Sequence, residues 1–443
     1  MEENSKRIVI VGGGLVGALC AYYFGKRGYR IDLYEYREDI RRSKSPRGRS
    51  INLSLSNRGR LALRDVGLEE EVLKSAVPMV GRRVHFQNGK VQSILYDEFT
   101  NQCIYSVGRN FLNKFLLTAI ESLPNVLLHF DCKLIDVNLK TDELTFYRCS
   151  SQDYLRVTGD LIIGADGAFS CLRRSLQSTP LFDCSQTYID HGYIELRISP
   201  EQSHLMKPNH LHIWPRGSMM LIALPNIDKS WTVTLFMPLS EFDRLVYKEM
   251  VLEFFKQVFP DVIPLIGTDQ LVNDVIRTKP SVLVSIKCSK LHYRDKFLIV
   301  GDAAHAIVPF YGQGMNAGFE DCTVLNNLLD KYSEDFGRVL EEFTRLRVSD
   351  AHAIADLAMY NYLEMRDLVT RPSYYLKKWF DKQMHRVVED KWQPLYYSVT
   401  FTHTKYEVCL QQRDWQSKVL KRSLLLFGIV ALSFSALTFI NIT

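Results

Sequence analysis

Several features that would assign this chain to a particular class of protein are missing from its sequence. The nine cysteines include no C-x-x-C pair, and such an odd, unpatterned set is typical of reduced thiols in the cytosol. The net charge is +5, and no basic run is long enough to indicate a nucleic-acid interface. The N-terminus, Met1 to Ser5, is acidic and has the pattern of neither a signal peptide nor an arginine-rich transit peptide.

Metal sites, repeats and low-complexity segments are also missing. His210 and His212 would share one face of a strand, but no third ligand lies nearby in the sequence, so we expect no bound metal. The composition, 46% hydrophobic and 24% charged over 443 residues, is that of an ordinary globular protein with two or three domains.

Three glycine-containing turns are the most informative feature that is present. Each ends a short apolar run that is typical of a buried parallel strand, and a helical pattern follows each. The turns are Gly12 to Gly17, Asp166-Gly167 and Gly301-Asp302. In this order and spacing they predict a protein that binds an extended dinucleotide, FAD rather than NAD alone.

The first turn matches the G-x-G-x-x-G template at Gly12, Gly14 and Gly17. These glycines allow a tight turn, a close approach to the pyrophosphate and close packing of helix on strand. The helix that follows, about Leu15 to Arg27, would direct its positive N-terminus at the phosphates. Glu35, at the end of the next apolar run, fits the acid that binds the ribose hydroxyls.

The third turn predicts the flavin end of the site. Asp302 at a strand end would accept hydrogen bonds from the ribityl hydroxyls. The segment from Pro309 through Gly314 starts a long helix, whose amides would stabilise negative charge on the flavin ring. His305 is interpreted as structural rather than catalytic. Asp166, in the middle turn, would alone be a turn and helix-cap residue, and its position between the other two makes it a predicted cofactor contact.

A basic stretch runs from Arg37 to Arg49. We interpret it as a solvated loop in preference to a direct contact with a phosphate or NADPH. Arg37, at its start, stays a candidate cofactor contact.

The ordered set of turns resembles the single-component flavoprotein aromatic hydroxylases of the para-hydroxybenzoate hydroxylase type, over about residues 6 to 330. In that family the Asp-Gly stretch serves both FAD and the pyridine nucleotide. Four further stretches and the apolar tail resemble a narrower family, the kynurenine 3-monooxygenases. These stretches are Gly48 to Leu53, Leu211 to Arg216, Gly312 to Asp321 and Met359 to Arg366.

The resemblance implies NADPH-dependent hydroxylation of L-kynurenine to 3-hydroxykynurenine by O2, through a flavin C4a-hydroperoxide, in tryptophan catabolism. The substrate's aniline nitrogen activates its own ring, so neither a metal nor a nucleophile triad is needed. The resemblance also implies roles for individual residues. Arg82 and Tyr96 match the pair that holds the substrate carboxylate, and Asn361 and Tyr396 match further substrate contacts. The positions that match FAD contacts are Arg109, Leu134, Asp302, Met315 and Asn316.

Near Arg82 the sequence departs from the expected pattern, because Val80 stands where a basic residue is expected and Arg83 follows Arg82. Phe236, Phe310 and Tyr311 are interpreted either as the lining of a dry cavity around the reacting ring or as plain core.

The expected fold is α/β. A Rossmann-like FAD-binding domain would comprise residues 1–79, 101–185 and 286–330. An antiparallel substrate sheet would comprise residues 80–100 and 186–285, with strands over Tyr188 to Ile198, His210 to Trp214, Met219 to Pro225 and Trp231 to Pro238. A helical region would cover residues 331–415.

The tail, Ser423 to Ile440, has no charged residue and would span roughly 27 Å as a helix. Lys418, Lys421 and Arg422 precede it. This pattern predicts a transmembrane tail anchor in contact with membrane lipid, and the resemblance implies the mitochondrial outer membrane with the enzyme facing the cytosol. The alternative is a hydrophobic helix packed on the enzyme body.

Two other classes of function occur on the same fold. Flavin halogenases carry a W-x-W-x-I-P stretch, and this chain has no tryptophan pair at that spacing. A hydroxylase of another aromatic substrate, or a non-enzymatic Rab-escort-like binding protein on the same fold, stays open at this point.

Overall fold

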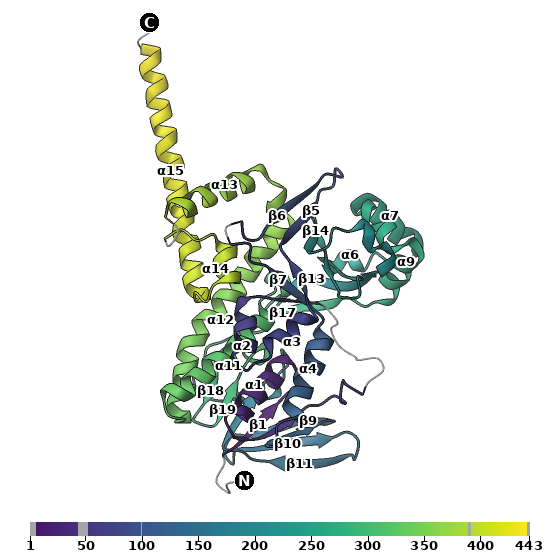
Figure 1. Ribbon diagram of the computed structural model, residues 1–443, viewed down its shortest axis with the longest axis vertical. Coiled ribbons are helices and arrows are strands. Elements are labelled where there is room, and N and C mark those ends of the chain that lie inside the picture. Colours follow the sequence, from purple (N-terminus) through teal and green to yellow (C-terminus); the bar gives the residue numbers. More distant parts are fainter. Residues whose placement is uncertain (1–5, 43–51, 99, 389–390, 441–443) are drawn as a thin grey trace.

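The structure is a computed structural model that describes residues 6–42, 52–98, 100–388 and 391–440, without the side chains of residues 424 and 426–440. Its elements form a mixed α/β fold with four sheets, as Figure 1 shows. Residues 43–51 lie outside the described residues, and they include the basic segment after Arg42 and the first four residues of the stretch from Gly48 to Leu53.

A six-stranded sheet forms the centre of the fold, in the order β18-β19-β12-β1-β2-β8. All neighbours are parallel except the edge strand β18. Its strands are rich in Ile, Val and Leu because helices bury both faces of such a sheet. They are β1 (Arg7–Val11), β2 (Arg30–Tyr34), β8 (Val126–His129), β12 (Leu161–Gly164), β18 (His292–Tyr293) and β19 (Phe297–Ile299).

The three predicted turns meet at one edge of this sheet. β1, β12 and β19 are adjacent, and Gly12, Asp166 and Asp302 follow their carboxyl ends. Ligands bind at such an edge in open α/β sheets. The helices that follow or flank these turns are α1 (Leu15–Lys26), α4 (Arg109–Glu121), α5 (Cys171–Leu176), α10 (Asp302–His305) and α11 (Gly314–Lys331).

A seven-stranded sheet lies beside this unit, in the order β17-β13-β16-β15-β14-β5-β6. Its strands are β5 (Gly81–His85), β6 (Val91–Leu95), β13 (Cys184–Ile198), β14 (His210–Arg216), β15 (Met219–Pro225), β16 (Trp231–Pro238) and β17 (Ser281–Cys288). The expected purely antiparallel sheet needs a correction, because β14 and β5 are parallel. β5 comes from a distant part of the chain, so no hairpin dictates its direction.

Short helices cover one face of the seven-stranded sheet. Trp214 and Trp231 of the sheet share a buried core with Phe255 of α7 (Lys248–Val258). The other helices of this group are α6 (Leu239–Phe242), α8 (Ile263–Ile266) and α9 (Thr268–Arg277). The opposite face contributes Met220 and Phe236 to a second core, which contains the loop before α11.

Besides the C-terminal helices, the remaining elements are two small sheets, two short helices and several 3₁₀ segments. Two three-stranded sheets comprise β9 (Cys132–Asn138), β10 (Glu143–Arg148) and β11 (Asp153–Val157), and β3 (Leu53–Leu55), β4 (Val77–Met79) and β7 (Ile104–Val107). The short helices α2 (Asn57–Asp65) and α3 (Glu69–Lys74) follow β3. Single 3₁₀ turns cover Pro200–Leu205, Pro260–Val262, Pro309–Tyr311 and Leu368–Thr370.

The C-terminal region is helical, as expected. It comprises α12 (Phe336–Arg366), α13 (Pro372–Val387), α14 (Leu395–Phe401) and α15 (Tyr406–Ile440). α12 runs along the body and packs against α11 and the start of α15, whereas the end of α15 projects away from the body (Figure 1).

The prediction of a transmembrane tail anchor, and with it of a mitochondrial outer-membrane location and a lipid partner, was wrong. A span needs about 20 consecutive apolar residues, and within the described residues no helix is long and apolar enough to cross a membrane. The part of α15 whose side chains are described carries charges at Glu407, Arg413, Asp414, Lys418, Lys421 and Arg422. Most of the predicted span, 423–440, lies outside the described side chains.

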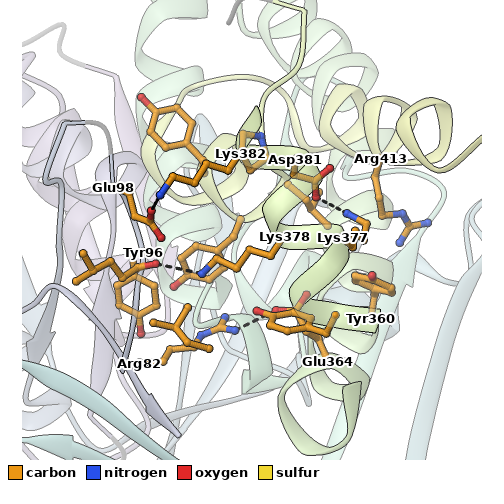
Figure 2. A pocket seen from close by; sticks show the side chains of 17 residues that line it. Arg82, Tyr96, Glu98, Tyr360, Glu364, Lys377, Lys378, Asp381, Lys382 and Arg413 are labelled. Carbon is orange, nitrogen blue, oxygen red and sulfur yellow. Dashed lines mark hydrogen bonds and ion pairs between the residues drawn. The ribbon is translucent and has the colours of Figure 1, made fainter. Parts of the chain in front are cut away.

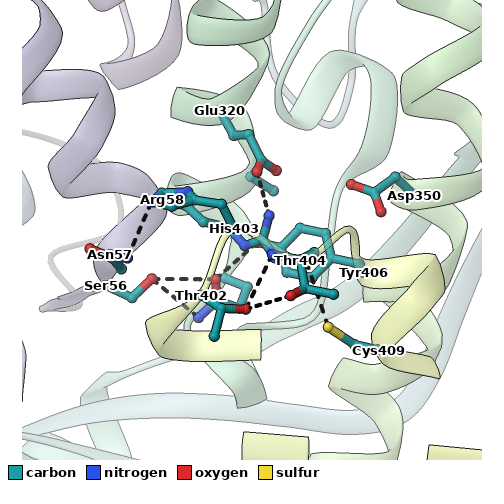
Figure 3. A network of polar contacts seen from close by, with 12 residues as sticks. Ser56, Asn57, Arg58, Glu320, Asp350, Thr402, His403, Thr404, Tyr406 and Cys409 are labelled. Carbon is teal, nitrogen blue, oxygen red and sulfur yellow. Dashed lines mark hydrogen bonds and ion pairs between the residues drawn. The ribbon is translucent and has the colours of Figure 1, made fainter. Parts of the chain in front are cut away.

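A buried network of charges joins α11, α12, α2 and the start of α15 (Figure 3). Arg58 of α2 donates to Glu320 and to the Thr404 carbonyl, and its guanidinium lies 3.9 Å from the centre of the Tyr406 ring. These contacts fix the first turn of α15 against the helix that follows the predicted flavin turn.

Arg347 of α12 is the second centre of this network. Its Nε lies 2.8 Å from Asp321, and its Nη1 lies 2.9 Å from Glu320 and 2.8 Å from Asp350. His305 Nε2 lies 2.6 Å from the other oxygen of Asp321. Burial alone would lower the pKa of His305, but the Asp321 carboxylate outweighs this effect and raises it.

We expect Arg347→Met to lower the free energy of unfolding by about 3–5 kcal/mol, because it leaves buried carboxylates without their cation. The measurement is the urea unfolding midpoint followed by circular dichroism. Arg345→Met is the matched control, because Arg345 lies on the same helix but pairs with Glu342 at the surface, and its midpoint should not move. Equal midpoints for the two variants would contradict the assigned role of Arg347.

Candidate functional site

The first glycine turn is built as a cradle with one open side. A Cβ atom at Gly12 would collide with the backbone of Ala165, and one at Gly17 would collide with the Gly12 carbonyl. A Cβ at Gly14 would meet no described atom within 4 Å. Gly12 and Gly17 are therefore needed for packing, whereas Gly14 faces the space that a pyrophosphate would fill.

Glu35, the acid that follows β2, lies at the rim of this cradle, and its predicted contact with the ribose stays a prediction. One carboxylate oxygen accepts from the Gly13 N–H at 2.7 Å. The other accepts from the backbone N–H and the Nε of Arg37, at 3.0 and 2.7 Å. Asn113 of α4 donates to the Gly13 carbonyl at 3.0 Å, which holds this helix, beginning at Arg109, against the turn.

Two of the helices that start at predicted cofactor turns, α1 and α11, lack side-chain caps, as do most helices in the described part of the chain. Neither Gly14 at α1 nor Gln313 at α11 makes a side-chain cap hydrogen bond. Ser170 and Asp335, by contrast, cap α5 and α12. The uncapped N–H groups of α1 and α11 can therefore bind anionic groups of a ligand.

Asp166 and Asp302 follow the neighbouring strands β12 and β19 at the same sheet edge. One oxygen of Asp166 accepts from the Cys171 N–H at 2.7 Å, and the other is buried without a hydrogen-bond partner in the described part of the chain. Burial raises the pKa of this carboxyl group. Arg173 donates to the Ala303 carbonyl at 2.8 Å and so connects the two turns. The open glycine cradle and the unpartnered carboxylate oxygen fit an extended dinucleotide such as FAD.

The loop before α11 is held from several directions. The Asn316 side chain accepts from the Ser56 N–H at 2.9 Å and donates to the carbonyls of Ser54 and Gly312, both at 2.8 Å. Since these bonds occupy its amide, any flavin contact from Asn316 comes from its backbone. The Tyr406 hydroxyl donates to Gln313 at 3.0 Å, so the C-terminal region also positions this loop.

The three other residues predicted to contact FAD lie in three different elements. Leu134 lies buried in β9, opposite Phe146. Met315 is buried in the first turn of α11. Arg109 is the first residue of α4. Their contact with FAD stays a prediction.

The four predicted substrate residues come together from four elements, β5, the end of β6, α12 and α14, although they are up to 314 positions apart. Arg82 is 4% exposed. Its Nη1 donates to Glu364 at 3.0 Å and its Nη2 to the Asn361 oxygen at 3.3 Å, so several of its five N–H donors remain available. Burial alone would lower the pKa of Arg82, but the facing Tyr396 and Glu364 raise it above its usual value.

Two tyrosines fix the plane of the Arg82 guanidinium. Its central carbon lies 4.6 Å from the Tyr396 ring centre and 5.8 Å from that of Tyr96, which favours the cation. The two rings are stacked with their centres 4.9 Å apart. The buried Tyr96 hydroxyl has no hydrogen-bond partner among the described residues, so it can donate to a bound carboxylate.

Asn361 connects Arg82 to the loop before α11, because its amide nitrogen donates to the Phe310 carbonyl at 2.8 Å. Phe310 stacks on Tyr362 with ring centres 3.6 Å apart, and the Phe236 ring centre lies 5.1 Å from that of Phe310 in an edge-on arrangement. These rings belong to the apolar cluster that also contains Tyr311. The site therefore has an aromatic, water-poor wall next to a buried cation.

The sequence reasoning missed Glu364, Tyr374 and Lys378, which line a cavity beside Arg82 (Figure 2). Glu364 was contained in the stretch from Met359 to Arg366, but nothing in its spacing distinguishes it from a solvated helix residue. Tyr374 and Lys378 lie one helical turn apart on α13, and no sequence motif marks that helix.

Comparisons with known proteins agree on one family. A model of an FAD binding domain matches residues 6–347. The kynurenine 3-monooxygenase of Anopheles gambiae is 52% identical, over 99% of this chain and 90% of its own length. The enzymes of the same name from Sus scrofa and Caenorhabditis elegans are 46% and 42% identical, over 96% of this chain and 90% and 96% of their own lengths.

Solved structures share the fold at lower identity. A tetrameric 2-methyl-3-hydroxypyridine-5-carboxylic acid oxygenase superposes with a TM-score of 0.68 and is 19% identical, over 84% of this chain and 95% of its own. PqsL, a probable FAD-dependent monooxygenase from Pseudomonas aeruginosa, superposes with a TM-score of 0.66 at 19% identity, over 82% of this chain and 97% of its own.

Proposed function

The chain belongs to the kynurenine 3-monooxygenase family, and we propose that it hydroxylates L-kynurenine to 3-hydroxykynurenine with NADPH and O2 on bound FAD. The observation that carries this proposal is the buried Arg82, next to an aromatic wall and to the loop that begins α11. An amino-acid substrate with an aromatic ring would have its carboxylate and its ring bound by these two features.

The residues that would hold FAD lie along the sheet edge. The turn at Gly14 and the N-terminus of α1 bind the pyrophosphate, Glu35 binds the adenosine ribose, and Asp302 binds the ribityl chain. The backbone N–H groups at Gly314 and Met315, at the start of α11, would stabilise negative charge on the flavin ring. When bound, FAD takes hydride from NADPH and activates O2. Contacts from Arg37, Arg109, Leu134, Asp166 and Asn316 are part of the same proposal.

The side chains position the substrate rather than exchange protons with it. Arg82 binds the carboxylate through its free N–H donors, with a further bond from Tyr96. Asn361 fixes Arg82 relative to the Phe310 carbonyl, and Tyr396 covers the guanidinium plane. The amino group of kynurenine donates electrons to the ring carbon beside it, so orientation and exclusion of water are what the protein must supply.

The test is NADPH oxidation by the purified yellow protein, with and without L-kynurenine, with the products identified by mass spectrometry. We expect 3-hydroxykynurenine in amounts close to the NADPH consumed, and little peroxide. A yellow protein that hydroxylates a different aromatic acid would overturn the choice of substrate. A protein purified without flavin that does not take up FAD would favour the binding-protein alternative.

A further inference from the structure

A cavity of about 140 Å³ lies on the outer side of Arg82 (Figure 2). Residues from β5, the end of β6, α12, α13, α14 and α15 line it. Phe236 and Phe310 of the aromatic wall are not among its lining residues. Arg82, Tyr96 and Tyr396 line this cavity, which we call the outer cavity, and Asn361 connects Arg82 to the aromatic wall at Phe310.

The outer cavity is rich in cations, and most of them already have a carboxylate partner. Lys377 lies 2.6 Å from Asp381, and Lys382 pairs with Glu98. Arg413 lies 2.7 Å from Asp414, and Arg82 lies 3.0 Å from Glu364. Within the described residues each of these four cations already has a carboxylate partner, although Arg82 keeps N–H donors that its partner Glu364 does not use.

Lys378 is the exception. Within the described part of the chain no carboxylate lies within 4.0 Å of its Nζ, which has a long contact of 3.5 Å to the Leu95 carbonyl. Figure 2 shows the side chain reaching across the cavity between Glu98 and the Arg82–Glu364 pair. A half-buried lysine that lacks an ion-pair partner among the described residues is a place where an anion is stabilised.

We propose that Lys378 forms a second carboxylate subsite, which receives the α-carboxylate of the substrate in the outer cavity before Arg82 binds it. This inference rests on the proposed function, since it assumes an amino-acid substrate. The carboxylate would pass from the ammonium group of Lys378 to the guanidinium of Arg82, whose free N–H donors bind it in the reacting position.

The charges in the outer cavity agree with a carboxylate that contacts Lys378 first and Arg82 second. Burial and the nearby charge of Arg82 lower the pKa of Lys378 to about 8, against the opposing effects of Glu98 and Glu364. The two cations therefore repel each other while the substrate is absent, and an arriving carboxylate relieves that repulsion. Attraction between charges of this kind acts mainly on the rate of association and depends on salt.

The experiment compares Lys378→Met with Lys382→Met in the full-length holoenzyme. Lys382 lies one helical turn further along α13 and is already paired with Glu98, so it is the matched control. For Lys378→Met we expect the KM for L-kynurenine to rise about tenfold with kcat within twofold of the wild type, and this loss should shrink at high salt. For Lys382→Met we expect KM within twofold.

A second substrate distinguishes a carboxylate subsite from a structural role. The decarboxylated analogue of L-kynurenine keeps the aminophenyl ketone and the amine but has no carboxylate, so its KM should be the same for the wild type and Lys378→Met. Lys378→Arg should recover part of the affinity for L-kynurenine. An equal rise in KM for both substrates, or an equal loss in Lys382→Met, would overturn the subsite.

The assay of the wild type distinguishes failure of the Lys378 subsite from failure of the proposed function. If the wild type hydroxylates L-kynurenine and Lys378→Met has an unchanged KM, the subsite is wrong and the proposed function stands. If the wild type does not hydroxylate L-kynurenine, both are wrong. Should Lys378→Met lose FAD, Lys378→Gln takes its place with the same expected results.

Discussion

Replacing Gly14 by valine is expected to give a folded, colourless protein without monooxygenase activity. Gly14 precedes α1 with φ −71° and ψ −174°, a conformation that any residue adopts. A Cβ there meets no described atom within 4 Å, so valine does not strain the fold. The same methyl groups occupy the space in which the pyrophosphate approaches the backbone. The measurements are flavin absorbance per chain and far-ultraviolet circular dichroism.

Gly337→Val is the control for a valine added to the start of a helix, since Gly337 lies in the first turn of α12. We expect this variant to bind FAD normally. Gly17→Val should fail to fold, because its Cβ would collide with the Gly12 carbonyl. Retention of one FAD per chain by Gly14→Val would contradict the assignment of the pyrophosphate to this turn.

The strands and helices expected around the glycine turns match the structure because local sequence encodes them, while the contacts of these turns with FAD stay predictions. Each turn needs a short apolar strand and a residue that tolerates its backbone, such as Gly12 with φ +106°. The same is true of the strands Met219–Pro225 and Trp231–Pro238, whose predicted bounds equal those observed. The domain boundaries stay a prediction.

Features that depend on distant parts of the chain were not visible in the sequence. The parallel pairing of β14 with β5 joins segments more than a hundred positions apart, and alternation of side chains carries no information about strand direction. Lys378 is one lysine among several on α13, and its lack of a partner follows from the placement of Glu98 and Glu364. The resemblance supplied Arg82, whereas its partner Glu364 required the structure.

The tail shows the opposite case, in which local sequence favoured an incorrect prediction. The uncharged, apolar stretch over residues 423–440 and the basic residues before it favour a span, although 18 residues is close to the lower limit. Arg58 binds the Thr404 carbonyl and packs on Tyr406, so the start of α15 is held against α2 and α11. Tyr406 of α15 also contacts Gln313 in the loop before α11.

Arg82→Ala is expected to lower kcat/KM for L-kynurenine by roughly 30-fold to several-thousand-fold, because loss of one member of a buried charge pair costs about 2–5 kcal/mol. The substrate carboxylate would lose its cation in a cavity that is shielded from water. FAD content should stay normal, since Arg82 lies outside the three dinucleotide turns. Arg82→Lys should recover part of the loss, because an ammonium group lacks the planar fork of donors.

Steady-state kinetics with two substrates and two controls decide the role of Arg82. Arg83 is the next residue of β5, and its guanidinium donates to Ser93 at 3.0 Å, near the surface, so Arg83→Ala should keep near-normal kcat/KM. Arg82→Ala also leaves Glu364 without its partner, and the double variant Arg82→Ala/Glu364→Gln removes that unpaired charge. If the double variant regains wild-type kcat/KM, the loss came from Glu364. If it stays impaired with L-kynurenine, while Arg82→Ala matches the wild type with the decarboxylated analogue, then Arg82 binds the carboxylate.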